Sequence, residues 1–161
     1  MRDNLQTALE NTETVYSQLV VIANGIVKEY TKDIDKIITD SYNGINELNN
    51  DMLRHLIITL SLKSYNFSEV KEKSLLKSQC AEALRKEAYA VEYNKAEGPV
   101  ATRENTATIN ISDEVLTENI YDLVSSLLKT KQDEIHRVVD ALKTVLMSRM
   151  AEAKLAQQLD E

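Results

Sequence analysis

Hydrophobic residues in positions 1–40 recur at alternating intervals of four and three residues, a spacing typical of one face of a long α-helix. The series consists of Leu5, Leu9, Tyr16, Leu19, Ala23, Ile26, Tyr30 and Ile37. Thr12 and Asp33 interrupt it, so the wider face of a helical bundle is as compatible with the pattern as a strict coiled coil. The pairs Asn43-Gly44 and Asn49-Asn50 weaken the helix, and we expect a bend or break over residues 40–51.

The middle of the chain predicts two helices separated by a turn. Apolar positions predict a helix from about Met52 to Ser64. The stretch SYNFS at 64–68 then suggests a turn, in which Ser68 acts as the N-cap of a helix over about 69–96. Gly98 and Pro99, the single proline of the chain, suit the end of that helix.

The stretch TATINIS after this stop alternates polar and apolar residues and is rich in β-branched ones, which predicts a short extended segment. A lone strand needs a partner, so we expect it to pair within the chain or with a neighbouring subunit. Ser112 or Asp113 then begins a long helix with an apolar stripe up to about Leu159. Its polar stretch at 129–134 indicates either an exposed segment or a kink.

These patterns, the low glycine and proline content and the scarcity of aromatic residues predict an all-α protein. We expect an elongated helical bundle or coiled coil with an extended or β-hairpin-like excursion near 99–112. A single domain, 1–161, would comprise an N-terminal coiled-coil-like helix (1–50), middle helices (52–97), a loop or extended segment (98–112) and a C-terminal helix (113–159). Long seams in a short chain favour a homo-oligomer. The candidate interface residues are Leu5, Leu9, Tyr16, Leu19, Ile26, Ile135, Leu142 and Leu146.

The formal net charge of −7 is unevenly distributed. Residues 1–52 carry −5, residues 53–105 carry +2 and residues 106–161 carry −4. The acidic total argues against nucleic-acid binding by bulk charge, but the middle leaves room for a local anion-binding face. Its candidate cations are Lys73, Lys77, Arg85, Lys86, Lys95 and Arg103, with Tyr89 and Tyr93 available to stack on unpaired bases. The alternative interpretation is pairing within the helix, for example between Glu82 and Lys86.

No pattern typical of an enzyme is present: the sequence lacks a phosphate-binding glycine loop, HExxH, CxxC and GxSxG. Asp133 and His136 form an isolated pair that favours a solvated polar patch, so we expect no catalytic residue, metal or cofactor. The single Cys80 excludes an intrachain disulfide, fits a reducing compartment and is expected to be buried. The N-terminus does not resemble a signal peptide, and the apolar stretch at 56–62 is too short to span a bilayer. These features predict a soluble, cytoplasmic protein.

A helix rich in Ala, Arg, Lys and Glu, followed by a glycine-containing turn and a long final helix, resembles bacteriophage recombination-mediator proteins of the UvsY type. The resemblance covers about residues 70–152. It is carried by Glu97, Gly98, Pro99, Ala101 and Thr102, and by the stripe Ile135, Leu142 and Leu146. It implies an oligomeric factor, in the cytoplasm of a host cell, that binds single-stranded DNA and assists a RecA-like recombinase on strands covered by single-strand-binding protein.

Two functional hypotheses follow. The first is a non-enzymatic DNA-binding recombination accessory factor that acts through the basic residues of positions 73–103. The second is a structural or protein-interaction module, such as a virion component, a scaffold or an inhibitor of a host protein, that uses its helical seams without nucleic acid.

Overall fold

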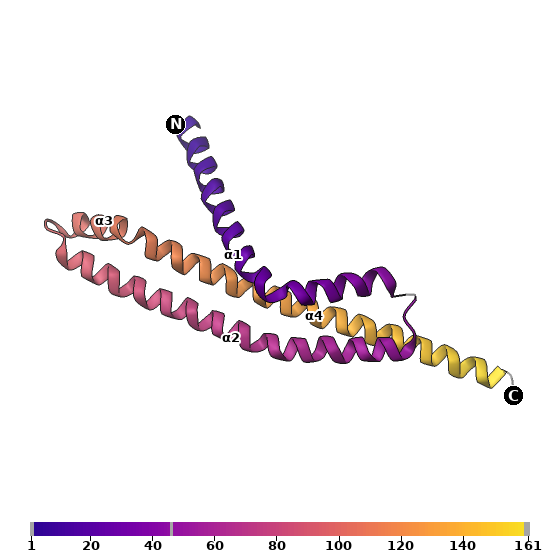
Figure 1. Ribbon diagram of the computed structural model, residues 1–161. Helices are drawn as coiled ribbons and strands as arrows, with labels where there is room; N and C mark the ends of the chain where they lie inside the picture. Colours follow the sequence, from indigo (N-terminus) through magenta and orange to yellow (C-terminus); the bar gives the residue numbers. More distant parts are fainter. Residues whose placement is uncertain (1, 46, 160–161) are drawn as a thin grey trace. The chain divides into compact units, whose positions relative to one another are not determined.

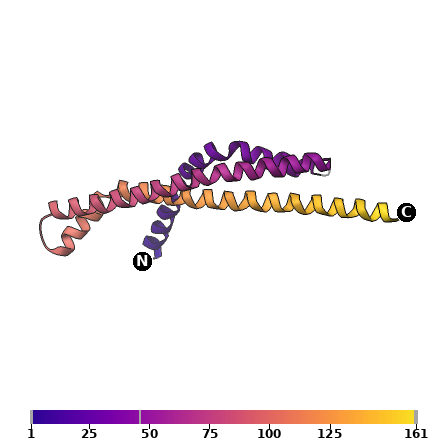
Figure 2. The ribbon, with the colours of Figure 1, turned by 90° about the horizontal axis from the view of Figure 1, so that it is seen from below.

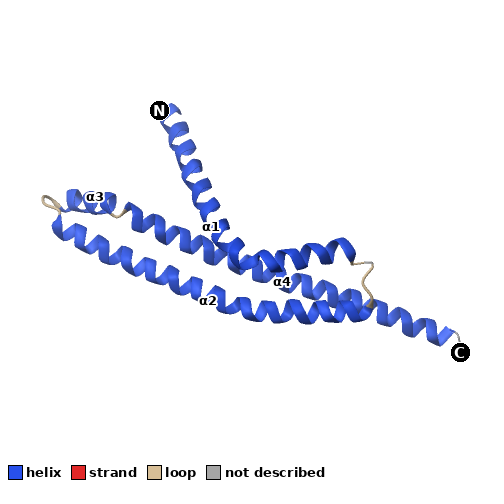
Figure 3. Cartoon of the chain, viewed as in Figure 1, coloured by secondary structure: helices blue, strands red, loops and turns tan. Residues whose placement is uncertain are grey.

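The protein is all-α. The computed structural model describes residues 2–45 and 47–159, and it describes side chains over 11–42, 44–45 and 47–158. Four helices follow one another: α1 (Arg2–Gly44), α2 (Asn50–Lys95), α3 (Val100–Asn110) and α4 (Ser112–Leu159) (Figure 1). No strand occurs over the described ranges (Figure 3).

The chain forms two compact units, each built from segments distant in sequence. Unit 1 comprises Met1–Glu29 and Lys71–Leu128, and unit 2 comprises Tyr30–Val70 and Lys129–Glu161. Within each unit α2 runs antiparallel to α4, and polar side chains join the two helices. These pairs are Ser78–Asp122 and Arg85–Glu118 in unit 1, and Ser64–His136 and Ser68–Gln132 in unit 2. The grouping of all 161 residues into one domain stays a prediction.

The break expected over 40–51 is confirmed. Helix α1 ends at Gly44, whose carbonyl oxygen accepts a hydrogen bond from the Glu47 amide at 2.9 Å. The Asn49 side-chain oxygen accepts from the Met52 amide at 2.8 Å and so caps the start of α2. The Arg149 guanidinium of α4 donates to two carbonyl oxygens of this turn, those of Ile45 (3.0 Å) and Leu48.

The turn predicted at 64–68 is wrong, because α2 continues through it without interruption. Ser68 donates to the Ser64 carbonyl oxygen one helical turn earlier (3.3 Å) and accepts from the Gln132 amide group (2.9 Å). Phe67, which lies between Ser64 and Ser68 in the sequence, is buried. With their hydroxyl groups hydrogen-bonded in this way, the serines are accommodated in the helix and Ser68 has no capping role.

The extended segment predicted after Pro99 is also wrong, because residues 100–110 form α3 (Figure 2). The helix stop itself is confirmed: Gly98 has a φ of 106°, a conformation that favours glycine. Pro99 also begins the next helix, since its carbonyl oxygen accepts from the Thr102 and Arg103 amides at 3.0 and 3.1 Å. Arg103, Ala107 and Ile111 are spaced four residues apart, and this helical spacing outweighs the alternation of TATINIS.

A single residue, Ile111, separates α3 from α4. Its amide donates to the Ala107 carbonyl oxygen (3.2 Å), and its own carbonyl oxygen accepts from the Val115 amide (3.1 Å). The polar stretch at 129–134 is a continuous part of α4.

The two units have different cores. Among the described side chains, the buried hydrophobic residues of unit 1 include three alanines: they are Ala23, Val27, Ala81, Ala107, Ile111, Val124 and Leu128. Unit 2 buries larger ones: Ile34, Ile38, Leu53, Leu60, Phe67, Ile135, Val138, Val139 and Leu142. Unit 1 therefore gains less from apolar burial for each buried position.

Candidate interaction surfaces

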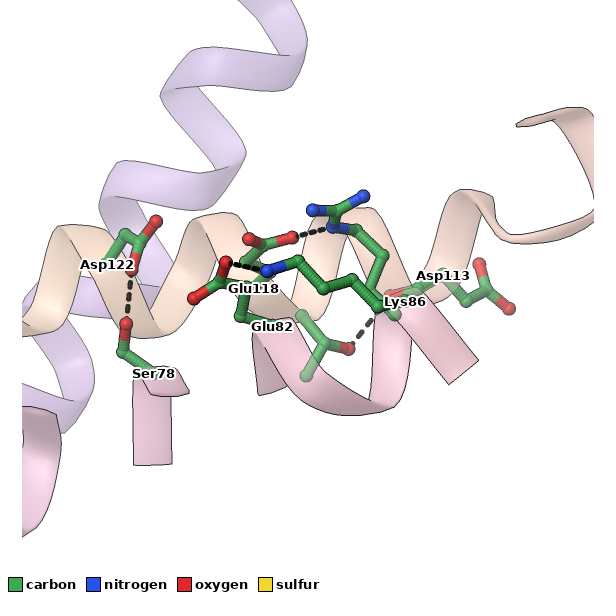
Figure 4. A network of polar contacts seen from close by, with 8 residues as sticks. Ser78, Glu82, Lys86, Asp113, Glu118 and Asp122 are labelled. Atoms are coloured by element: carbon green, nitrogen blue, oxygen red, sulfur yellow. Dashed lines mark hydrogen bonds and ion pairs between the residues drawn. The ribbon is translucent and has the colours of Figure 1, made fainter. Parts of the chain in front are cut away.

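The six predicted cations all lie in unit 1, five on α2 and Arg103 on α3. Arg85, Lys86 and Lys95 form ion pairs with carboxylates. Arg85 is half-buried and donates to Glu118 of α4; Lys86 pairs with Glu82 at 2.5 Å and Lys95 with Glu92 at 2.7 Å (Figure 4 shows the pairs of Glu82 and Glu118). The Glu82–Lys86 pairing considered from the sequence is thus confirmed.

The neighbouring lysines lower the pKa of two of these carboxyl groups. A hydrogen bond from Lys86 holds the pKa of the Glu82 carboxyl below its ordinary value, and the Lys86 charge acts in the same direction. Hydrogen bonds from Lys95 and then Asn110 lower the pKa of Glu92. The carboxylates are therefore in the charged form that neutralises the lysines at neutral pH.

Arg103 is held in the corner between α2 and α3. Its Nε and one terminal nitrogen donate to the Tyr93 carbonyl oxygen at 3.1 and 3.0 Å, and the guanidinium lies 4.2 Å from the centroid of the Tyr93 ring. Tyr89 stacks on Tyr93 with ring centroids 6.2 Å apart. The tyrosine faces expected to receive bases are thus engaged with each other and with Arg103.

Lys77 lies over the Tyr121 ring of α4, 5.9 Å from its centroid, and Lys73 is exposed. The expected basic face is therefore divided among local contacts, with carboxylates, a carbonyl oxygen and an aromatic ring. These contacts weaken the attraction that the same cations would offer to a phosphate backbone.

The residues of the predicted oligomer interface differ in exposure. Leu5 and Leu9 lie outside the residues whose side chains are described. Tyr16 is 61% exposed, while Leu19, Ile26 and Leu146 are half-buried. Ile135 and Leu142 are buried within unit 2. The part of these residues in an oligomer interface stays a prediction.

Helix α1 carries two apolar stripes one residue apart, both with the spacing four, three, four. The inner stripe is Tyr16, Val20, Ala23 and Val27, and it contributes Ala23 and Val27 to the core of unit 1. The outer stripe is Val15, Leu19, Ile22 and Ile26, with Val15 46% and Ile22 48% exposed. Leu19 and Ile26 of the outer stripe were predicted as interface residues from the sequence, which assigned them to one seam with Tyr16 and Ala23.

An outward-facing apolar groove borders α2 and α4 in unit 1. Leu76, Cys80 and Leu84 of α2 line it together with Tyr121 of α4, and Asp113 and Glu114 lie along it; its volume is about 550 Å³. The expected burial of Cys80 is wrong, since this thiol is exposed. The helix buries Ser74 and Ser78 instead, and Ser78 donates a hydrogen bond to Asp122 of α4, while Leu76 and Leu84 are exposed.

His136 meets a serine rather than a metal site. Its Nε2 lies 3.0 Å from the Ser64 hydroxyl oxygen. The pair lacks the backbone donors of an oxyanion hole, because the amides around Ser64 are used inside α2. Within the described part of the chain, no group of three or more His, Cys, Asp or Glu residues could hold a metal ion.

Comparison with family models, with curated proteins and with solved structures finds no match to this chain. None of the helices in the described ranges contains a stretch both long and apolar enough to cross a membrane.

Proposed function

We propose that this chain is a non-enzymatic protein-interaction module that uses the outer stripe of α1 to bind an amphipathic helix of a different protein. The observation that carries this proposal is the outer stripe itself: Val15, Leu19, Ile22 and Ile26 extend an apolar face beyond the seam that unit 1 uses for its own core. Helices recognise apolar grooves and stripes through this spacing.

The composition of the stripe defines the chemistry of its partner. The segment from Thr14 to Val27 contains no Asp, Glu, Lys, Arg or His. Depletion of charge is typical of the centre of a protein–protein interface. An anionic membrane or a nucleic acid would instead be met by Lys and Arg beside the apolar residues. The partner that fits best is therefore a helix with a neutral, apolar face.

The energetics of α1 support the same conclusion. Residues 11–18 are all exposed although they are helical, and a helix in water depends largely on packing of its apolar face for its stability. The alanine-rich core of unit 1 adds comparatively little apolar burial. A partner helix on the outer stripe would supply the missing contacts.

The resemblance to recombination mediators suggests partners of this kind, a RecA-like recombinase or a single-strand-binding protein. Binding to single-stranded DNA is a separate hypothesis with a separate test, described below.

A photo-crosslinking amino acid at Ile22 tests the proposal in cells that produce the protein. Asn24 is the control, because it is also exposed but lies about 200° from Ile22 around the helix, whereas Val21 lines the same surface hollow as Ile22. We expect an adduct with one distinct protein from position 22 and not from position 24. Ile22→Asp should then weaken binding of that purified protein by at least about tenfold, and Asn24→Asp should not. Equal adducts at both positions, or an adduct only with a second copy, would contradict it.

A further inference from the structure

The outward face of α2 in unit 1 is symmetric in sequence. Lys73, Leu76, Cys80, Leu84 and Glu87 follow one another at intervals of three, four, four and three residues, so the pattern reads alike in both directions from Cys80. These intervals place all five side chains on one face of the helix. Each of the five residues is exposed, with Leu76 59% and Leu84 61% accessible.

This face exposes leucine side chains of the kind that a helix ordinarily buries. The same segment buries Ser74, Ser78 and Ala81, and its Ser78 and half-buried Arg85 bind Asp122 and Glu118 of α4, while Leu76 and Leu84 line the groove beside Tyr121. Two exposed leucines flanking a small thiol leave an apolar strip with a charge of opposite sign at each end. The strip therefore has the composition of one side of a protein–protein interface.

We propose that two copies of this chain associate through this face, with their α2 helices antiparallel about a two-fold axis at Cys80. The antiparallel arrangement brings Leu76 of each copy onto the second copy's Leu84, and Cys80 next to the second copy's Cys80. It also brings Lys73 of each copy to the second copy's Glu87. Every contact occurs twice, as an isologous interface requires.

Charge complementarity selects this occupant and this direction. In a parallel pair Lys73 would face Lys73 and Glu87 would face Glu87, so both ends would repel. In the antiparallel pair both ends attract. Asp113 and Glu114 lie along the same groove as Leu84, so the end that receives the second copy's Lys73 is acidic beyond Glu87 alone. This contact is independent of the partner proposed for α1, because it uses another helix and needs only the purified chain.

Oxidation of the purified chain with diamide tests the two-fold axis directly, since the single cysteine is the reporter. We expect a disulfide-linked dimer on a non-reducing gel. The control variant carries Cys80→Ser and Gln79→Cys, which moves the thiol to an exposed neighbour about 100° around the helix. It should form far less dimer. Equal rates for the two proteins would overturn the proposal.

Sedimentation equilibrium without oxidant tests the register, with helicity followed by circular dichroism. Lys73→Glu and Glu87→Lys should each weaken dimerisation by about tenfold, because each change creates two like-charge contacts. The double variant should recover to within about threefold of the unmodified chain. Leu84→Asp should give a monomer, whereas Ile22→Asp should not change the dimer. A chain that stays monomeric, or a double variant without recovery, would overturn the proposal and leave the α1 partner untouched.

Discussion

The Arg103 guanidinium lies across the Tyr93 ring and donates two hydrogen bonds to the Tyr93 carbonyl oxygen, so this side chain joins α3 to the end of α2. The carbonyl oxygen belongs to the last turn of α2, where such groups lack a partner within the helix. A residue expected to bind phosphate thus has a structural role at the corner.

Replacing Arg103 tests that role. We expect Arg103→Ala to lower the free energy of unfolding by about 1–2 kcal/mol, because two hydrogen bonds and a cation–π contact are lost. Arg103→Lys keeps the charge without the planar fork and should recover less than half of the loss. Urea denaturation measures both, and faster amide exchange over 100–110 would localise the effect. An unchanged Arg103→Ala protein would contradict it.

Two glycines predict opposite responses to the same substitution. Gly98→Ala should destabilise the protein by about 1 kcal/mol, because a φ of 106° is strained for any residue with a Cβ. Gly25 lies inside α1 with open space around its Cα, so Gly25→Ala should stabilise by about 0.5–1 kcal/mol. Thermal unfolding of the two variants provides the comparison. A Gly98→Ala protein that is no less stable than the unmodified chain would contradict the strain at Gly98, and a destabilised Gly25→Ala protein would contradict the open space at Gly25.

The contribution of Lys131 to the stability of the fold is expected to depend on pH in the alkaline range. Burial lowers its pKa, but hydrogen bonds to Asp35 and Glu134 outweigh that effect and raise the pKa above its ordinary value. The folded state therefore binds this proton more tightly than the unfolded chain, and the contribution is complete below pH about 10.5 and disappears as the pH rises through the folded-state pKa.

Lys131→Met isolates this contribution. We expect the variant to be less stable by about 1 kcal/mol near neutral pH, with the difference shrinking above pH about 10.5. Denaturation curves of both proteins at several pH values measure it. Lys143→Met is the control, since Lys143 forms only an exposed pair with Asp140. A difference that grows with pH would contradict the sign.

Single-stranded DNA binding can be measured by fluorescence anisotropy with a labelled oligonucleotide at several salt concentrations. Because Arg85, Lys86 and Lys95 are paired with carboxylates, we expect weak binding with a salt slope of about one or less. Substituting these three residues by Gln should change it little. A slope corresponding to several phosphates, lost in the triple variant, would instead support the recombination-mediator hypothesis.

Periodicity and composition were sufficient to predict the helical class, and two Asn-containing pairs were sufficient to predict the main break. The repeated spacing of α1 and α4 and the Asn-Gly pair before α2 carry that information locally. The errors at 64–68 and 100–110 arose where Ser, Asn and Thr suggested turns or strand. The Ser and Thr hydroxyl groups have partners in the fold, as Thr108 does when it donates to the Glu104 carbonyl oxygen at 2.8 Å, and local propensity does not reveal such partners.

The candidate surfaces depend on contacts at long range. Pairs one helical turn apart, such as Glu82–Lys86, could be predicted from spacing. The pairing of Arg85 with Glu118, 33 residues away, required knowledge of how α2 lies against α4. The outward position of Leu76 and Leu84 follows from the same alignment, because Ser78 and Arg85 make the contacts with α4.

The polar contact between α2 and α4 in unit 1 also has a thermal consequence. The α2–α4 contact of unit 1 combines Ser78–Asp122 and Arg85–Glu118 with smaller apolar side chains than unit 2 buries, so separating it should give a smaller heat-capacity change. The seam containing Leu53, Leu60 and Leu142 in unit 2 should give a larger one. A plot of stability against temperature should therefore be less curved for the first contact than for the second.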